Sequence, residues 1–159
     1  MNKTYLLLGS NMGNSRQQLG KAQKHIEKNI GTITRSSSLY KTAAWGKTDQ
    51  PDFWNQVVIV ETVLAARETM KAILDIEKKM GRLRTEKNAP RNIDIDILLF
   101  NKDIIESSSL SVPHPQLQNR RFALVPLNEL SPNLLHPVSL KTIHQLLRVC
   151  PDNLAVKKK

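Results

Sequence analysis

Two aspartates, Asp94 and Asp96, stand two residues apart in the stretch PRNIDIDILLF (90–100), where carboxylates alternate with isoleucines before an apolar run. This period-two pattern predicts a strand that enters a buried sheet. Side chains two residues apart on a strand share one face, with Cα atoms roughly 6.5–7 Å apart. Two oxygen ligands so placed suit a pair of Mg²⁺ ions, which lie about 3.5–4 Å apart in two-metal sites. The alternative is that both aspartates are solvated, although Asp is uncommon in strands and like charges on one face repel.

The segments before this strand predict the elements that position it. Apolar runs, helical periodicity and turn residues indicate the order strand, helix, strand, strand, helix, strand. That order is typical of the α+β class with a ferredoxin-like βαββαβ core, an antiparallel sheet with two helices packed on one face. The expected elements lie at about residues 3–9, 15–30, 32–42, 53–63, 66–80 and 93–100.

The turn after the first strand, GSNMGN (9–14), has neither the Lys-Ser/Thr of a P-loop nor the spacing of a dinucleotide fingerprint. We interpret it as structural, with Asn14 or Ser15 capping the helix that follows. Its glycines are therefore expected to shape a turn and not to bind phosphate.

Beyond residue 100, the sequence predicts a C-terminal hairpin and helices added to this core. Residues 103–105 are expected to pair back as a short strand, a short helix opens at Asn119 and runs to about Leu127, and a last amphipathic helix spans 140–149. The Lys157–Lys159 run is expected to be a frayed, solvated tail. Because no repeat or boundary is evident, residues 1–159 are predicted to form a single domain.

The composition restricts the class of protein and of partner. The 159 residues are 40% hydrophobic without an apolar run of membrane-spanning length, and the single cysteine, Cys150, allows no internal disulfide. The expectation is a cytoplasmic protein that binds no membrane. The net charge of +10 predicts an anionic partner. An aromatic content of 4% favours a small ligand over single-stranded nucleic acid.

Four motifs together resemble one family. DQPDFWN (49–55), GRLR (81–84), PRNIDIDILLF (90–100) and VPHPQLQNRRF (112–122) occur in the order and near the spacing found in 6-hydroxymethyl-7,8-dihydropterin pyrophosphokinase, an enzyme of folate biosynthesis. The resemblance runs from about Gly9 to Pro132. It implies transfer of the β,γ-pyrophosphoryl unit of ATP to the pterin 6-hydroxymethyl oxygen, which leaves AMP.

The resemblance also implies roles for charged residues. Asp94 and Asp96 would hold two Mg²⁺ ions, one touching the α,β-oxygens of ATP and one the β,γ-oxygens. Arg82 and Arg91 would stabilise charge during transfer, because guanidinium groups match phosphate geometry and stay charged. No residue stands out as a dedicated protein base. The implied ATP-binding residues are Glu77, Arg84, Ile97, Ser111, His114 and Arg120, of which the first could equally be an ordinary surface glutamate.

The pterin would need a flat slot with hydrogen-bond partners for its amide edge. Phe53 and Phe122 match the pair that sandwiches the ring, and such stacking contributes about 1 kcal/mol each beyond burial. Asn55 offers both a donor and an acceptor to the pterin edge. Both phenylalanines could equally be core residues, whereas an asparagine in an apolar strand needs a partner. Backbone groups would complete the recognition at Thr42, Ala43 and Trp45.

Two departures from the family pattern concern the loops. Where the family has Arg-Trp-Gly before Pro-Arg, this chain has Lys87-Asn88-Ala89, so the tryptophan that caps the closed site is missing. Ala43-Ala44-Trp45 replaces the more usual proline-containing run on the pterin side. We expect loops 43–52 and 82–92 to be mobile lids that order over the ligands.

Two other functions are compatible with the sequence. A basic ferredoxin-like module would bind RNA through its sheet, which requires exposed aromatic side chains on the central strands and no aspartate pair. An inactive family member that serves as a scaffold would account for the lost tryptophan. Because no interface-like apolar helix is evident, a monomer is the default expectation.

Overall fold

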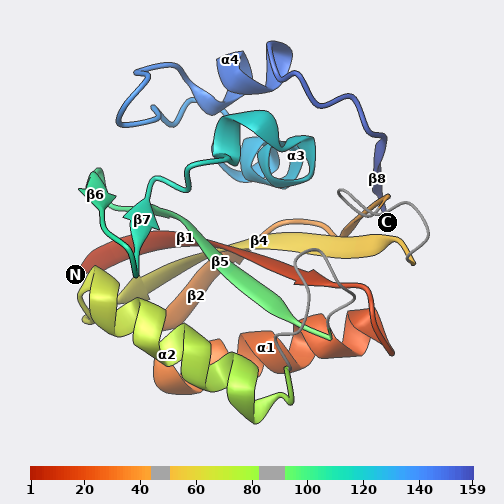
Figure 1. Cartoon of the computed structure of the whole chain (residues 1–159), viewed down its shortest axis with the longest axis vertical. Helices are drawn as coiled ribbons and strands as arrows, with labels where there is room; N and C mark the ends of the chain where they lie inside the picture. Colours follow the sequence, from red (N-terminus) through yellow and green to blue (C-terminus); the bar gives the residue numbers. More distant parts are fainter. Residues whose placement is uncertain (44–50, 83–91) are drawn as a thin grey trace.

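The computed structural model describes residues 1–43, 51–82 and 92–159, and its main feature is an antiparallel sheet between two layers of helices (Figure 1). The strand order is β5-β1-β4-β3-β8, and β2 also pairs with β4. This is the predicted α+β, ferredoxin-like core, with β1 between β5 and β4. The strands are β1 (Asn2–Ser10), β2 (Thr32–Ser36), β3 (Tyr40–Thr42), β4 (Phe53–Thr62), β5 (Asp94–Phe100) and β8 (Val156–Lys158).

Helices cover both faces of the sheet (Figure 1). One layer contains α1 (Ser15–Asn29) and α2 (Ala66–Lys79), and the other contains α3 (Arg121–Leu130) and α4 (Ile143–Arg148). The middle of β1, Tyr5–Leu8, is apolar because it lies between both layers. Leu6 and Leu8 belong to the core under α1 and α2, whereas Tyr5 and Leu7 belong to the core under α3 and α4. Among the described residues, no helix combines the length and apolarity needed to cross a membrane.

The start of α1 is capped as the sequence predicts. The Asn14 side chain accepts a hydrogen bond from Gln17 N at 3.1 Å, which satisfies one of the N–H groups that a helix start leaves without an intrahelical partner.

The segment predicted as one strand from 32 to 42 is divided into β2 and β3. Residues 37–39 separate them. The buried Ser37 hydroxyl accepts from Val57 N at 3.0 Å and donates to Ser38 O at 2.8 Å. The Gln56 side chain donates to the Ser37 carbonyl at 2.8 Å. The prediction of a continuous strand was wrong because these side-chain bonds compete with the backbone ladder.

The C-terminal lysines are not the frayed tail that the sequence predicts, because Val156–Lys158 forms β8 and pairs antiparallel with β3. Lys159 N donates to Leu39 O at 2.8 Å and continues this pairing. Strand pairing uses backbone N–H and C=O groups. A run of charged side chains therefore does not prevent pairing with a strand whose backbone groups on one edge are otherwise unpaired, as on the outer edge of β3.

Other C-terminal boundaries also differ from the prediction. Residues 103–105 do not pair back on β5; instead β6 (Ile105–Glu106) pairs with β7 (Ser111–Val112). A short 3-10 turn, η1 (Leu117–Asn119), precedes α3, which ends at Leu130 instead of Leu127. Helix α4 starts only at Ile143, because Thr142 and Gln145 form a reciprocal capping box there.

Candidate active site

Asp94 and Asp96 lie on β5, on the face of the sheet that α3 covers. Asp96 is paired with Leu7 of β1 and Asp94 with Gly9, and Leu7 belongs to the core under α3. The intervening Ile95 is buried in the opposite core, under α1 and α2. The alternation in the sequence therefore has a direct structural cause: one face of β5 is apolar core, and the other presents two carboxylates.

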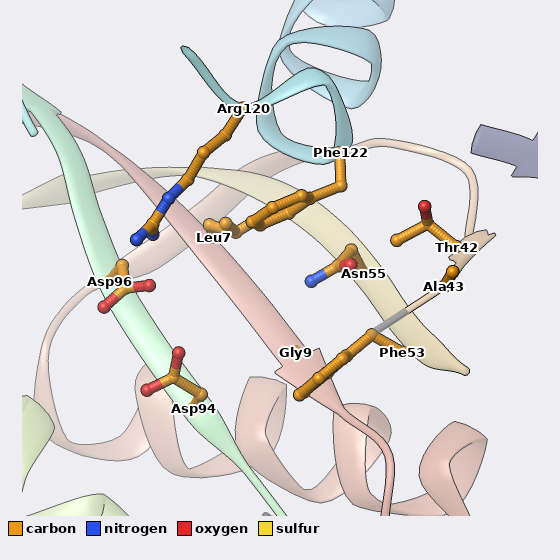
Figure 2. Close-up of a pocket in the computed structure, with 10 residues that line it drawn as sticks. All are labelled: Leu7, Gly9, Thr42, Ala43, Phe53, Asn55, Asp94, Asp96, Arg120 and Phe122. Carbon is orange, nitrogen blue, oxygen red and sulfur yellow. The ribbon is translucent and has the colours of Figure 1, made fainter. Parts of the chain in front are cut away.

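A pocket opens beside these carboxylates, below the N-terminal end of α3 (Figure 2). The side chains of Phe53 and Phe122 lie on either side of Asn55, and the two aspartates lie farther along the same pocket (Figure 2). One end of the pocket is therefore aromatic and the other acidic. Its described lining residues are Leu7, Gly9, Thr42, Ala43, Phe53, Asn55, Asp94, Asp96, Arg120 and Phe122.

The two carboxylates are close enough to affect each other's ionisation. Burial and the neighbouring Asp94 carboxylate raise the pKa of Asp96 well above its ordinary value, and the Arg120 guanidinium partly opposes this. The Arg120 side chain points toward Asp96 across the pocket (Figure 2). A cation bound between Asp94 and Asp96, in addition to the Arg120 guanidinium, would lower the electrostatic cost of keeping both carboxylates ionised.

Arg82 bridges two acidic side chains from different elements. Its Nη1 lies 2.6 Å from Glu77 Oε2 on α2 and 2.5 Å from Asp94 Oδ1 on β5. Glu77 is only 2% exposed, and its Oε2 also accepts from Ile95 N at 2.8 Å. Glu77 therefore links α2 to the backbone of Ile95, which lies between the two aspartates. The expectation that Glu77 could be a surface glutamate was wrong.

Asn55 lies in the pocket with half of its amide group unsatisfied. Its side chain is 4% exposed, its Nδ2 donates to Leu8 O at 3.5 Å, and its Oδ1 has no hydrogen-bond partner in the described parts of the chain. Gly9 makes room for this amide, because a Cβ at Gly9 would lie 2.8 Å from Asn55 Nδ2. A buried acceptor without a partner costs stability, so the pocket favours a ligand that donates a hydrogen bond here.

His114 stands where β7 is joined to the outer edge of β5. His114 N donates to Leu98 O at 2.9 Å, and its Nδ1 accepts from Gln116 N at 3.1 Å. Burial and the nearby Arg120 charge lower the pKa of His114 to about 4, although Asp94 opposes this shift. At neutral pH the imidazole is therefore uncharged, with its proton on Nε2, where it can donate to an acceptor.

Comparisons with known proteins agree with this geometry. Residues 5–132 match the model of the 7,8-dihydro-6-hydroxymethylpterin-pyrophosphokinase (HPPK) family. The chain belongs to this family. As an HPPK, it is an ATP-dependent pyrophosphokinase of folate biosynthesis with ATP as co-substrate.

Two relatives of the same enzyme name span nearly the whole chain. The 2-amino-4-hydroxy-6-hydroxymethyldihydropteridine pyrophosphokinase of Aquifex aeolicus is 39% identical over 91% of this chain and 90% of its own length. That of Haemophilus influenzae is 36% identical over 96% of each chain. Among solved structures, Plasmodium falciparum wild-type HPPK-DHPS superposes with a TM-score of 0.75 at 22% identity, over 93% of this chain and 43% of that one. At 22% identity, this structural similarity shows that the two proteins share a fold and nothing more.

Most residues predicted to bind the HPPK substrates lie around the pocket or along β5. Ile97 lies on β5, the edge strand of the sheet. Because Ile95 N points away from β1 toward Glu77, the backbone of Ile97, two residues on, faces the same outer edge. Ser111 is on β7, which runs beside β5. Trp45, Arg84 and Arg91, the 87–89 departure, and most of both predicted lids lie outside the described residues.

Two lining residues were not predicted from the sequence. Leu7 and Gly9 come from β1; the sequence predicts only that Leu7 lies in a strand and that Gly9 begins a turn. A signal was present for Gly9, because a glycine at the end of a strand often marks the close approach of another group. Leu7 carried no such signal.

The low pKa of His114 predicts a pH-dependent stability. The ordinary pKa of 6.5 applies to the unfolded chain, and the folded pKa is about 4. The unfolded state therefore binds more protons in this range, and stability falls as the pH drops from 6.5 toward 4, by up to about 3 kcal/mol. Urea unfolding at pH 7 and pH 4.5 should show a smaller loss in His114→Gln than in the wild type. Equal losses in both proteins would contradict the assignment of the shift to His114.

Proposed function

We propose that the protein transfers the pyrophosphoryl group of ATP to the hydroxymethyl oxygen of 6-hydroxymethyl-7,8-dihydropterin and releases AMP. The observation that carries the proposal is the unsatisfied Oδ1 of Asn55, buried between two phenylalanines and beside a pair of carboxylates. A flat heterocycle with N–H donors on its edge would satisfy this oxygen and stack on the rings. A pterin has that shape and those donors.

The nucleotide would lie toward the acidic end of the pocket. Arg120 lines the pocket there, and a guanidinium group can bind phosphate oxygens with two parallel hydrogen bonds. The neutral His114 would donate to a phosphate oxygen from Nε2. We assign the adenine to the backbone near Ile97 and Ser111, on the outer edge of β5, where a planar base can form backbone hydrogen bonds. Arg84 and Arg91 are proposed as further phosphate contacts.

Asp94 and Asp96 fit the role of Mg²⁺ ligands. Burial beside Asp94 makes ionisation of Asp96 costly, and a cation would remove that cost. Within the described ranges, no group of three or more His, Cys, Asp or Glu side chains could hold a metal by itself. Phosphate oxygens and water would supply the remaining ligands, as is usual for Mg²⁺ bound with a nucleotide. Two Mg²⁺ ions held there would supply positive charge next to the phosphates that react.

The contribution of the protein itself would be position and charge. Phe53, Phe122 and Asn55 orient the pterin, so that its hydroxymethyl arm points toward the carboxylate end of the pocket. Arg82 and Arg91 would stabilise the charge on the transferred group. Phosphoryl transfer needs little covalent help from a protein, and holding two reactants in line supplies much of the acceleration.

The proposal is tested by separating the nucleotide products. The purified protein, with Mg²⁺, ATP and the hydroxymethyl-dihydropterin, should form AMP and the pterin diphosphate in equal amounts, and neither without the pterin or with excess EDTA. Formation of ADP, or AMP formation that ignores the pterin, would refute it. Calorimetric titration with the pterin and a nonhydrolysable ATP analogue distinguishes an enzyme from an inactive scaffold that binds neither.

The RNA-binding alternative has less support. Recognition on a ferredoxin-like sheet needs an open sheet face with exposed aromatic side chains. In the described structure, helices lie over both faces of the sheet (Figure 1).

Replacement of Gly9 is predicted to weaken pterin binding more than it weakens the fold. In Gly9→Ala, the new Cβ would lie 2.8 Å from Asn55 Nδ2, so the amide would have to move from its position between the rings. We expect the KM for the pterin to rise about 10- to 100-fold, the effect of a misplaced buried polar group, and the KM for ATP to stay within about 2-fold.

Gly20→Ala is the matched control for this replacement. Gly20 lies exposed on α1, and a Cβ added there would meet open space, so its replacement should leave both KM values unchanged. A wild-type pterin KM in Gly9→Ala would contradict the proposed role of Asn55.

A further inference from the structure

We propose that the C-terminal segment Asp152–Lys158 is a brace that holds two walls of the pterin-facing pocket, with Asp152 as a positioning residue. The inference rests on the proposed function, because that function assigns this pocket to the pterin. The segment lies outside residues 5–132, which match the family model. It contacts the two elements that carry Phe122 and Thr42, which both line the pocket (Figure 2).

The first contact fixes the start of α3. Arg120, at the N-cap position, makes no side-chain capping bond. Asp152 supplies one from a distant part of the chain: its Oδ2 accepts from Arg121 N at 3.0 Å, and its Oδ1 accepts from Leu154 N at 3.0 Å. A carboxylate is favoured at a helix N-terminus. In the chain, Arg121 lies between Arg120 and Phe122, which both line the pocket. The bond to Arg121 N therefore helps to fix the backbone from which these two side chains project.

The second contact fixes the end of β3. Val156 is paired with Thr42, and Thr42 Oγ1 donates to Ala155 O at 2.9 Å. Thr42 and the following Ala43 line the pocket. On its other edge, β3 pairs with β4, where Thr42 lies opposite Phe53. Without β8, this three-residue strand, whose Thr42 lines the pocket, would be an edge of the sheet.

A single segment thus connects the helix that carries Phe122 to the strand that lies beside Phe53. The separation of these walls sets the width of the slot into which a planar ring must fit. Stacking depends on ring separation, so loosening either contact would lower pterin affinity while leaving Asp94 and Asp96, on the opposite side of the sheet order, in place.

Asp152→Ala tests the first contact. At a temperature where circular dichroism shows the variant folded, the Kd of the pterin, measured by calorimetry with a nonhydrolysable ATP analogue, is expected to rise about 5- to 10-fold, the effect of one lost net hydrogen bond. The kcat at saturating substrates should stay within about 2-fold. Asp103→Ala, which removes an exposed aspartate after β5, should change neither value. If Asp152→Ala does not fold, Asp152→Asn, which keeps one acceptor oxygen, replaces it.

Lys157→Pro tests the second contact. Lys157 lies opposite Lys41, two residues before the bond from Lys159 N to Leu39 O, so its N–H also faces β3. Proline removes that N–H, and the pterin Kd is again expected to rise about 5- to 10-fold. Lys157→Gln removes the same charge but keeps the N–H, and should bind like the wild type.

The outcomes separate the brace from the proposed function. A raised pterin Kd in both folded variants, with normal controls, supports the brace. A wild-type Kd in either folded variant overturns it, even if the melting temperature falls, because that result shows a structural role only. If the wild type itself binds no pterin, the proposed function fails, and the assignment of the pocket fails with it.

Discussion

Asp96→Asn is expected to lower kcat by about 10³-fold or more and, at neutral pH, to raise the stability of the ligand-free protein. The amide keeps the size of the side chain but is a poor Mg²⁺ ligand, and a metal contributes several kcal/mol to transition-state stabilisation. The folded pKa of Asp96 is raised by burial and by Asp94. Stability is therefore lost as the pH rises from the ordinary pKa of Asp toward the folded pKa, because the unfolded chain releases this proton first, and the neutral amide removes this cost.

Two measurements together test this prediction. Rates of AMP formation measure the first effect, and urea unfolding at pH 7 measures the second. Asp103→Asn, in the exposed turn after β5, is the matched control and should alter neither. A variant that keeps its rate would exclude Asp96 as a metal ligand. A variant that loses both rate and stability would show that the carboxylate is structural.

The fold core was predictable because its signals are local. The Ile-Asp alternation of β5 indicates two chemically different faces, and the structure places core on one and a pocket on the other. The cap at Asn14 is likewise set by neighbouring residues. The candidate site was predictable only through the family motifs, since Phe53, Asn55 and Phe122 meet through tertiary structure.

Other features depend on contacts that no local pattern reports. Glu77 lies 18 residues before Ile95, and only the packing of α2 beside β5 makes it a buried partner of that backbone. The lysine run of β8 resembles a solvated tail, yet it pairs with β3, which is more than 100 residues earlier in the chain. In both cases the decisive free energy comes from tertiary contacts, which override local preference.

Arg82→Ala is expected to lower the free energy of unfolding by about 3 kcal/mol at pH 7, the cost of removing one cationic partner from two carboxylates in or near the protein interior. Arg82 Nη1 contacts both Glu77 and Asp94, and Glu77 is 2% exposed. Without the guanidinium, the folded-state pKa values of these carboxyl groups should rise. The stability deficit should therefore be largest at neutral pH and shrink as the pH falls toward 5, because protonation then replaces the missing cation.

Urea unfolding of wild type and variant at pH 7 and pH 5 measures this deficit. Arg67→Ala removes an exposed arginine from α2 and should cost less than about 1 kcal/mol at either pH. Adding Glu77→Gln to Arg82→Ala should recover part of the loss, because an amide needs no opposite charge and the two sites are in contact. A deficit that is small, or independent of pH, would show that Arg82 does not neutralise these carboxylates. If the deficit follows the pH as expected, Arg82 neutralises these carboxylates and holds Asp94 in place in the ligand-free protein.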